Sequence, residues 1–377
     1  MIQNPGILVT IFAFMLVLGP LVFLHELGHY LAGRWFGVKA EEFSIGFGRE
    51  VAGFTDRRGT RWKFGWLPLG GYVRFAGDMN PASQPSPEWL SLPAQERART
   101  FQAKPLWQRA IIVAAGPIMN FLIAIAILGG FAYVNGRPVT PPVIGSVLED
   151  GVAAKAGLQV GDRITAIDGR RISDFFDIAE FTMIRAGETV SIEYQRGGQT
   201  RRISATIGSQ TLKDRFGNLT HRGVLGIGRS DTVLKPVALW EAPGVGLSET
   251  VRTMRNMIEG LQRIILGRIP VTELGGPIKI AKISGEFLAM GPVEFVYLIA
   301  LISINLGFIN LLPVPVLDGG HLLFYAVEAV RRRPVEPRVM DWAYRGGLVA
   351  ILALMLFVTF NDLGAFGVWR SLAGLIG

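Results

Sequence analysis

The chain has 377 residues, of which 50% are hydrophobic and only 18% are charged. This composition is too apolar for a soluble globular protein and indicates insertion into a membrane. Lys and Arg exceed Asp and Glu by 38 to 30, but they are scattered without a basic run, which argues against a nucleic acid partner.

Four stretches are long and apolar enough to cross a bilayer, which requires about 20 residues. The predicted membrane segments occupy residues 1–34, 107–135, 292–331 and 343–372. In the third, the apolar run from Phe295 to Leu317 is interrupted late by Pro313 and Pro315. The first segment lacks the basic region and the cleavage site of a signal peptide, so we expect it to remain a helix of the protein.

Basic residues in the short connections predict the orientation, because Lys and Arg favour the cytoplasmic side. The connection between the first two segments carries 12 of them from Arg34 to Arg109, and the last connection carries Arg331, Arg332, Arg333, Arg338 and Arg345. Both connections should therefore be cytoplasmic. Both termini and the long segment between the second and third spans should then be extracytoplasmic.

The first cytoplasmic connection, residues 35–106, contains an alternating stretch from Glu41 to Phe75 with turn residues at 56–59. This pattern predicts a β-hairpin. Its many aromatic side chains are unusual for a solvated hairpin, so we expect it to be associated with the membrane, where protein or water must satisfy its backbone. Residues 80–99 are rich in Pro, Ser and charge and predict a solvated loop.

The extracytoplasmic segment divides in two by its hydrophobic period. Residues 140–230 contain short apolar strands punctuated by glycine and predict one small β-rich domain. Residues 243–268 carry apolar side chains at helical spacing, from Leu247 to Ile265, with charged residues on the other face. This amphipathic helix either lies in the membrane interface or packs against the β-rich domain.

A candidate metal site lies at the end of the first membrane segment, in the sequence His25-Glu26-Leu27-Gly28-His29. In a helix the two histidines share a face and can bind one Zn²⁺, while Glu26 can reach a metal-bound water as general base. Because the chain contains no cysteine, any further ligand must be His or a carboxylate. The alternative is that these side chains merely reach toward the lipid headgroups, which is costly near membrane depth.

A catalytic zinc needs a third protein ligand and one open position. Asp318 follows an uncharged stretch that begins at Val296, which makes it a candidate. It could equally be the N-cap of the helix that follows. His321 is the rival ligand, and Glu328 is a poorer one because it lies toward the arginine cluster. The preceding prolines favour a site, since irregular backbone at membrane depth requires protein or a water-filled cavity beside it.

Asn120 and Asn310 are amides within otherwise apolar spans. Each could bind the substrate backbone or polarise a scissile carbonyl, as the donors of an oxyanion hole do. The commoner role of an amide in a membrane is a hydrogen bond between helices. Gly116-Pro117, close to Asn120, indicates a close or kinked helix approach and is compatible with both roles.

Several motifs, in this order, resemble those of the site-2 intramembrane zinc metalloproteases, in particular their bacterial regulator-of-sigma-E protease branch. They are HELGH, AGPIMNF, a single PDZ-like module, LGGPIKIA and NLLPVPVLDGGH, and they span nearly the whole chain. The resemblance implies an α-helical polytopic membrane protein with four transmembrane helices, a membrane-associated β-hairpin region and one inserted extracytoplasmic PDZ-like α+β domain. It also implies the bacterial inner membrane, with both termini and the PDZ-like domain in the periplasm.

The resemblance further implies roles for individual residues. One Zn²⁺ per chain is expected on His25, His29 and Asp318, with Glu26 activating water. Residues 245–265 are expected to form a gating helix at the membrane surface. An unwound substrate strand paired with an edge of the hairpin would satisfy backbone groups that lipid cannot satisfy. The expected substrate contacts are Asn310, Asn120, Gly70, Gly71 and Tyr72.

The PDZ-like interpretation is based on PVIGSV followed by GVAAKAGLQVGDRITAIDG. Such domains bind an extended peptide by strand addition, and we expect the groove at Ile144, Gly145, Ser146 and Val147. Known members of the branch carry two tandem PDZ domains, whereas residues 140–230 have room for one, which weakens the expectation of a size filter formed by paired domains. The alternative is a plain structural β-domain.

The expected function is hydrolysis of a peptide bond in or near the transmembrane segment of single-span membrane proteins, such as anti-sigma factors or remnant signal peptides, after a first extracytoplasmic cleavage. The partners are these substrates and membrane lipids. A non-enzymatic PDZ adaptor is one rival, and it predicts that His25 and Asp318 can be replaced without effect. A metal-ion transporter is another, disfavoured because four spans without inverted repeats and an open three-ligand site suit hydrolysis better.

Overall fold

The computed structural model describes residues 5–77, 93–213, 219–231, 233–267, 270 and 275–365. The chain divides into two compact units, each with its own hydrophobic core. The first unit comprises Met1–Leu128, Gly246–Met254 and Leu274–Asp362. The second comprises Gly129–Val245, Arg255–Glu273 and Leu363–Gly377.

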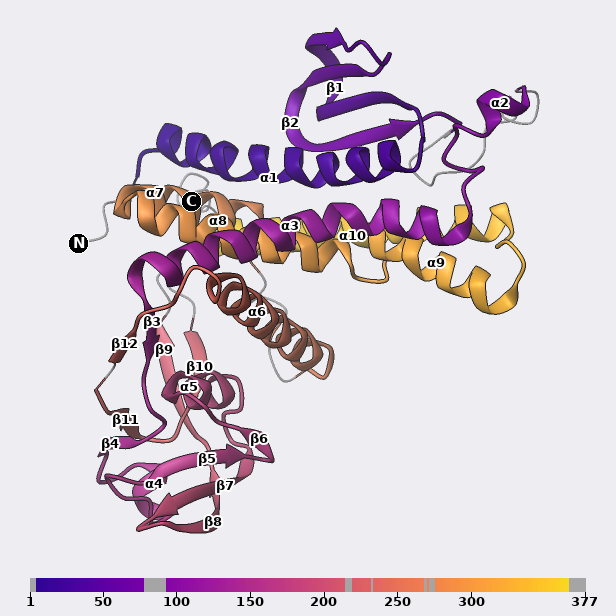
Figure 1. Ribbon diagram of the computed structural model, residues 1–377. Coiled ribbons are helices and arrows are strands. Elements are labelled where there is room, and N and C mark those ends of the chain that lie inside the picture. The colour runs from indigo at the N-terminus through magenta and orange to yellow at the C-terminus, as the bar shows by residue number, and fades with distance from the viewer. Residues whose placement is uncertain are drawn as a thin grey trace, which may run out of the picture. The chain divides into compact units, whose positions relative to one another are not determined.

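Four helices in the described residues are long and apolar enough to cross a membrane, in agreement with the four predicted spans. They are α1 (Ile7–Trp35), α3 (Leu106–Asn135), α8 (Pro292–Asn310) and α10 (Pro337–Ala365). Within the first unit the long helices run roughly parallel to one another (Figure 1). A one-turn helix, α2 (Ala94–Arg97), precedes α3, and most of the predicted loop at 80–99 lies outside the described residues.

The third predicted membrane segment, 292–331, is two helices rather than one. α8 ends at Asn310, and a separate helix, α9 (Asp318–Arg331), follows after turns. The two prolines between them lack the N–H that a continuing helix would need, which accounts for the break. Leu317 is the N-cap of α9, and the Asp318 side chain makes no capping hydrogen bond. The prediction that Asp318 caps a helix is therefore wrong, and its carboxylate is free for another role.

One helix of the first unit, α7 (Pro277–Met290), was not predicted from the sequence. It packs against α1 and α8. The carboxylate of Asp362 on α10 accepts hydrogen bonds from the backbone N–H groups of Gly276 and Lys279, at 3.3 and 3.1 Å, and Nζ of Lys279 lies 3.9 Å from it. Asp362 is fully buried. Its carboxylate therefore supplies a hydrogen-bond acceptor for backbone N–H groups at the start of α7, which have no acceptor within the helix itself.

The predicted hairpin is present but folds back on itself. β1 (Ala40–Thr55) and β2 (Arg61–Phe75) are joined by a turn in which Gly59 has a positive φ of 83°. Residues 40–45 of β1 pair with two parts of β2, 61–64 on one side and 71–75 on the other, and 61–64 also pairs with 52–55. The result is one curled antiparallel sheet beside α1 (Figure 1), in which the segments follow the order 71–75, 40–45, 61–64 and 52–55, so that 71–75 is an edge.

The second unit holds the predicted β-rich domain. A four-stranded sheet in the order β6-β5-β7-β8 packs with α4 and α5 around a core that includes Ile164, Ile192 and Phe181. α5 begins with a capping box formed by Asp174 and Asp177. The strands and short helices of the second unit are β3 (Arg137–Val139), β4 (Ile144–Val147), α4 (Val152–Lys155), β5 (Arg163–Ile167), β6 (Arg170–Arg171), α5 (Phe175–Met183), β7 (Thr189–Arg196), β8 (Gln199–Thr206), β9 (Gly208–Lys213), β10 (Leu219–Val224), β11 (Ile227–Arg229) and β12 (Val233–Lys235).

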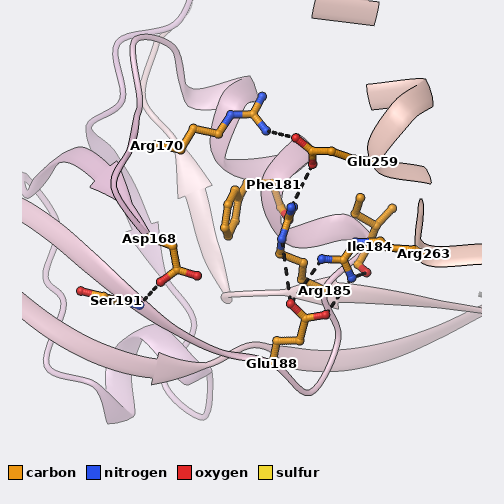
Figure 2. Close-up of polar contacts among 9 residues, drawn as sticks. All are labelled: Asp168, Arg170, Phe181, Ile184, Arg185, Glu188, Ser191, Glu259 and Arg263. Atoms are coloured by element: carbon orange, nitrogen blue, oxygen red, sulfur yellow. Dashed lines mark hydrogen bonds and ion pairs between the residues drawn. The ribbon is translucent and has the colours of Figure 1, made fainter. Parts of the chain in front are cut away.

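The predicted amphipathic helix is α6 (Ala242–Ile265), and its charged face contacts the β-rich domain (Figure 2). Glu259 accepts hydrogen bonds from Arg170 at 3.1 Å and from Arg185 at 2.9 Å. Arg263 donates to the carbonyl of Ile184 and to the carboxylate of Glu188, at 2.5 and 2.7 Å. The apolar side chains Ile258 and Ile265 are 54% and 75% exposed. Packing against the domain is thus confirmed for the charged face, while Ile258 and Ile265 of the apolar face remain exposed.

Candidate metal centre

Three side chains from two helices converge in the first unit. α1 places His25 and His29 one turn apart, and their Nε2 atoms are 3.3 Å apart. Asp318, the first residue of α9, directs Oδ2 to both, at 3.2 Å from Nε2 of His25 and 3.5 Å from Nε2 of His29. No other group of three His, Cys, Asp or Glu within the described residues comes together in this way. The structure thus brings together the three residues expected to bind metal.

The spacing of these three atoms fits a tetrahedral zinc site. Zinc bonds of about 2.0–2.2 Å to nitrogen and oxygen place neighbouring ligand atoms of a tetrahedron about 3.3–3.5 Å apart. The separations found, 3.2, 3.3 and 3.5 Å, lie close to that range. Oδ2 of Asp318 is buried and has no hydrogen-bond donor among the described residues. A cation shared by the three atoms would satisfy this carboxylate oxygen and both imidazoles.

Hydrogen bonds on the far side of each imidazole prepare Nε2 for a metal. Nδ1 of His29 lies 2.9 Å from the backbone carbonyl of Ile112, which can only accept, so Nδ1 carries the proton and Nε2 keeps its lone pair. Nδ1 of His25 lies 3.0 Å from the side-chain amide of Asn120. The Oδ1 atom of this amide is buried and has no partner among the described residues. A half-turn of the amide would let Oδ1 accept the Nδ1 proton of His25.

A glycine on α3 makes room for both imidazoles. A Cβ on Gly116 would overlap Nε2 of His29 and lie 2.9 Å from Nε2 of His25. The helices also touch at Gly28, where a Cβ would overlap the carbonyl oxygen of Ala115. The close helix approach that Gly116-Pro117 indicated is therefore real, and it brings the backbone of α3 directly against the two histidines.

Glu26 lies beside this group, in contact with the edge strand of the hairpin sheet. A Cβ on Gly71 would lie 3.0 Å from Cγ of Glu26 and 2.8 Å from the carbonyl oxygen of Ser44, so only glycine lets the strand approach this closely. The edge strand and Glu26 thus face the same space.

That space is a cavity of about 600 Å³. Its walls come from α1, the strand 71–75, α3, the last residue of α8, the start of α9, and Tyr344 of α10. His25, Glu26, His29 and Asp318 all line it. The cavity is large enough for a short stretch of extended peptide and is lined mainly by apolar side chains around this polar group.

The remaining predicted site residues have different surroundings. Asn310 and Tyr72 line the cavity; Asn310 donates to the carbonyl of Leu306, and the Tyr72 hydroxyl donates to Glu42. Asn120 is fully buried against His25 and does not line the cavity, which agrees with the alternative of a hydrogen bond between helices. Gly70 has a positive φ of 90° and packs against Phe47.

The two rival ligands are placed apart from the three metal-facing atoms. His321 lines the cavity without joining the group formed by His25, His29 and Asp318. Glu328 forms an ion pair with Arg109 at 3.1 Å, which engages its carboxylate elsewhere. Asp318 is therefore the only one of the three candidates whose ligand atom meets both histidines.

The predicted peptide groove on β4 is partly occupied by the domain itself. β4 pairs with β11 on one edge, and near Ile144 its other edge bonds to residues 161–164. Ile144 is fully buried in the domain core, so it cannot line an open groove. Among the described residues, β11 has a strand partner on one edge only. A peptide that adds a strand here would use the open edge of β11 rather than β4.

Comparison with known proteins decides the family. The model of peptidase family M50 matches residues 13–354. The chain belongs to peptidase family M50. This M50 peptidase is 42% identical over 357 residues to a predicted zinc metalloprotease of Agrobacterium fabrum, with 93% of this chain and 95% of the relative covered. It is also 36% identical over 399 residues to metalloprotease MmpA of Caulobacter vibrioides, covering 98% of this chain and 99% of the relative.

The M50 assignment makes the protein a zinc metalloprotease with apolar, membrane-length helices. Among solved structures, the chain is similar to the PDZ domain of the SdrC-like protein from Listeria innocua, with 30% identity and a TM-score of 0.19. That similarity covers 24% of this chain and 94% of the other.

Proposed function

We propose that this M50 peptidase hydrolyses peptide bonds in or near the transmembrane segment of single-span membrane proteins, such as anti-sigma factors or remnant signal peptides that a first extracytoplasmic cleavage has left. Its place is the bacterial inner membrane, with both termini and the β-rich domain in the periplasm. The observation that carries the proposal is the meeting of His25, His29 and Asp318 at tetrahedral spacing beside an unpaired strand edge. One zinc per chain would be held by these three residues.

Each residue of the centre has a defined task in hydrolysis. Bound zinc would act as a Lewis acid and lower the pKa of its water. Glu26 takes the proton from the attacking water at its carboxylate and passes it to the leaving amine. The carbonyl of Ile112 holds the His29 imidazole in the tautomer that leaves Nε2 free. After the half-turn that lets Oδ1 accept the Nδ1 proton, the amide of Asn120 would do the same for His25. Asn310, at the cavity wall, is positioned to donate to the developing oxyanion.

The hairpin sheet explains how a membrane-embedded substrate could be held. A transmembrane helix must unwind before its peptide bond can be attacked, and its freed N–H and C=O groups need partners in a medium without water. Among the described residues, the edge 71–75 has a strand partner on one side only, and Gly71 in it lies against Glu26. Strand addition there would supply the partners and align the scissile bond with the metal centre.

The β-rich domain is proposed to act through α6. The helix contributes 246–254 to the first unit and its C-terminal half to the second, where Glu259 and Arg263 bind the domain (Figure 2). The β-rich domain is thereby connected to a helix that continues into the catalytic unit. This gives the proposed gating helix a physical connection to the domain.

Paired measurements on the purified full-length protein test the proposal. Zinc content and cleavage of a model transmembrane substrate with a destabilised helix are measured for wild type, Glu26→Gln and Asp318→Ala. We expect about one zinc per chain and cleavage in wild type, zinc without cleavage in Glu26→Gln, and neither in Asp318→Ala. His321→Ala should keep its zinc, and Glu294→Gln, an exposed glutamate at the start of α8, should keep both.

Four outcomes would contradict the proposal. Cleavage by Glu26→Gln at the wild-type rate would show that Glu26 is not the general base. Zinc retained in Asp318→Ala but lost in His321→Ala would show that the third ligand is His321 and not Asp318. Metal flux through reconstituted wild type, or peptide binding without any cleavage, would favour the transporter or the adaptor instead.

A further inference from the structure

A second cavity of the first unit carries more basic than acidic side chains in its lining and shares no residue with the metal cavity. Its volume is about 620 Å³. The cations come from separate elements, namely the last turn of α1, the start of the hairpin, the turn of the hairpin and the segment after α2. They are Arg34, Lys39, Arg58 and Arg99, against two acids, Glu41 and Glu96.

Within the described part of the chain, these cations are not neutralised by ion pairs. Among the described residues no ion pair involves any of the four, and Glu41 is engaged by Arg74 at 3.4 Å. Asp56 bears on Arg34 through its charge, but its carboxylate already accepts hydrogen bonds from the backbone of Arg58 and Thr60 and from the indole of Trp62. The cavity therefore keeps an excess of positive charge that an anion could balance.

Aromatic side chains place this cavity at the depth of the lipid headgroups. Trp35, next to Arg34 at the end of α1, is 88% exposed, and Trp107 at the start of α3 is 57% exposed. The ring of Trp107 packs edge-on against Phe36 at 5.4 Å between centroids. Exposed tryptophans at helix ends mark the membrane interface, and basic residues beside them mark its cytoplasmic side.

We propose that this cavity binds the phosphate headgroup of an anionic glycerophospholipid from the cytoplasmic leaflet. Arginine recognises a phosphate through paired N–H donors, and Arg34 and Arg58 supply two such groups. The exposed indole of Trp35 offers a surface to the lipid's glycerol and upper acyl region. A zwitterionic headgroup would bring its ammonium group against the same cations, so the site should select anionic lipid.

An occupied site would hold the base of the hairpin. The backbone N–H of Lys39 donates to the carbonyl of Arg99, and the carbonyl of Lys39 accepts from the N–H of Ala76. Ala76 directly follows the edge 71–75, so this edge is joined to Lys39 and, through it, to Arg99 of the cavity. A phosphate bridging α1, the hairpin turn and this base would fix the sheet whose edge borders the metal cavity. Anionic lipid would thereby stabilise the substrate-holding strand.

Native mass spectrometry of the full-length detergent-purified protein tests the inference independently of proteolysis. Wild type is incubated with equimolar phosphatidylglycerol and phosphatidylcholine, and the retained lipid is counted. We expect phosphatidylglycerol to be retained selectively and its retention to fall about five- to thirtyfold in Arg34→Gln/Arg58→Gln. The matched control is Arg331→Gln/Arg333→Gln, which removes equal charge from exposed positions at the end of α9 and just after it, and which should change retention less than twofold.

Two results would overturn the proposal. Equal losses in the two double variants would mean that the lipid responds to overall charge and not to the cavity. Equal retention of phosphatidylcholine, or displacement of phosphatidylglycerol from the cavity by excess inorganic phosphate, would mean that the site does not select a lipid. Hydrogen exchange at 71–75 gives a second readout, which should slow on adding phosphatidylglycerol to wild type and stay constant in the cavity variant.

Discussion

Replacing Gly116 by Ala should displace the metal centre through a single methyl group. Its Cβ would overlap Nε2 of His29 and lie 2.9 Å from Nε2 of His25, whereas ordinary contacts of a Cβ begin at 3.4 Å. Relief requires His29 to retreat by about 1 Å, which is several times the tolerance of about 0.2 Å in a metal–ligand distance. Moving the helices apart instead would withdraw the carbonyl of Ile112 from Nδ1 of His29.

The expected loss is large because both forms of relief damage the site. Loss of a partner behind a ligand alone lowers metal affinity about 10- to 100-fold, and displacement of the ligand atom adds to it. We therefore expect Gly116→Ala to bind zinc at least about 100-fold more weakly. Zinc content after dialysis against graded chelator concentrations measures this directly, with substrate cleavage followed in parallel.

The same helix supplies a matched control. Gly130 also lies in α3, and a Cβ there would meet nothing within 4 Å. Gly130→Ala should keep its zinc and its activity, and the better helix propensity of Ala adds up to about 1 kcal/mol of stability. If Gly116→Ala retained wild-type zinc affinity and activity, the close packing of α3 on the two histidines would be refuted.

Two further predictions concern the second unit. Burial would raise the pKa of Asp162, but hydrogen bonds from Arg196 and from the backbone of Gln159 outweigh it and hold that pKa below its ordinary value. This stabilisation is complete above the unfolded-state pKa of about 3.9 and is lost as the pH falls through the lower folded-state pKa, so hydrogen exchange in β5 and β7 should accelerate below about pH 4. Asp162→Asn should lower the free energy of opening by about 2 kcal/mol and so accelerate this hydrogen exchange already at pH 7. Glu193→Gln, in an exposed pair with Arg202, should not accelerate it. Equal effects of the two variants would contradict the stabilising role of Asp162. Glu259→Gln should speed hydrogen exchange in residues 255–265 about tenfold, because the contacts of residue 259 with Arg170 and Arg185 are weakened. Glu249→Gln serves as the control, because Glu249 forms its ion pair with Arg252 of the same helix. No difference between these two variants would refute the role of the charged contacts in holding α6.

The parts of the metal centre differ in how far sequence could predict them. The two histidines and Glu26 are predictable because their spacing fixes their positions on one helix. Asp318 is 289 residues beyond His29, and residue spacing alone could not distinguish it from His321. The contact of His29 with Ile112 uses a backbone carbonyl, which any side chain at that position would present, so no sequence pattern marks it.

The fold shows a similar division. Long apolar helices and the hairpin follow from local patterns, but the double pairing of residues 40–45 depends on a bend that alternation does not encode. α7 escaped prediction because its buried Lys279 and Glu286 break the apolar pattern that a buried helix is expected to show. The prolines marked the break after α8, yet the helix already ends at Asn310, before the first of them.

The cap on α7 has a consequence for biosynthesis. Gly276 and Lys279 obtain their hydrogen-bond acceptor from Asp362, more than 80 residues later in the chain and within the last membrane helix. The start of α7, which packs against α1, is therefore completed by a side chain that is synthesised more than 80 residues after it. We expect α7 to reach its final packing only after α10 has been synthesised, which sets an order for the assembly of the first unit.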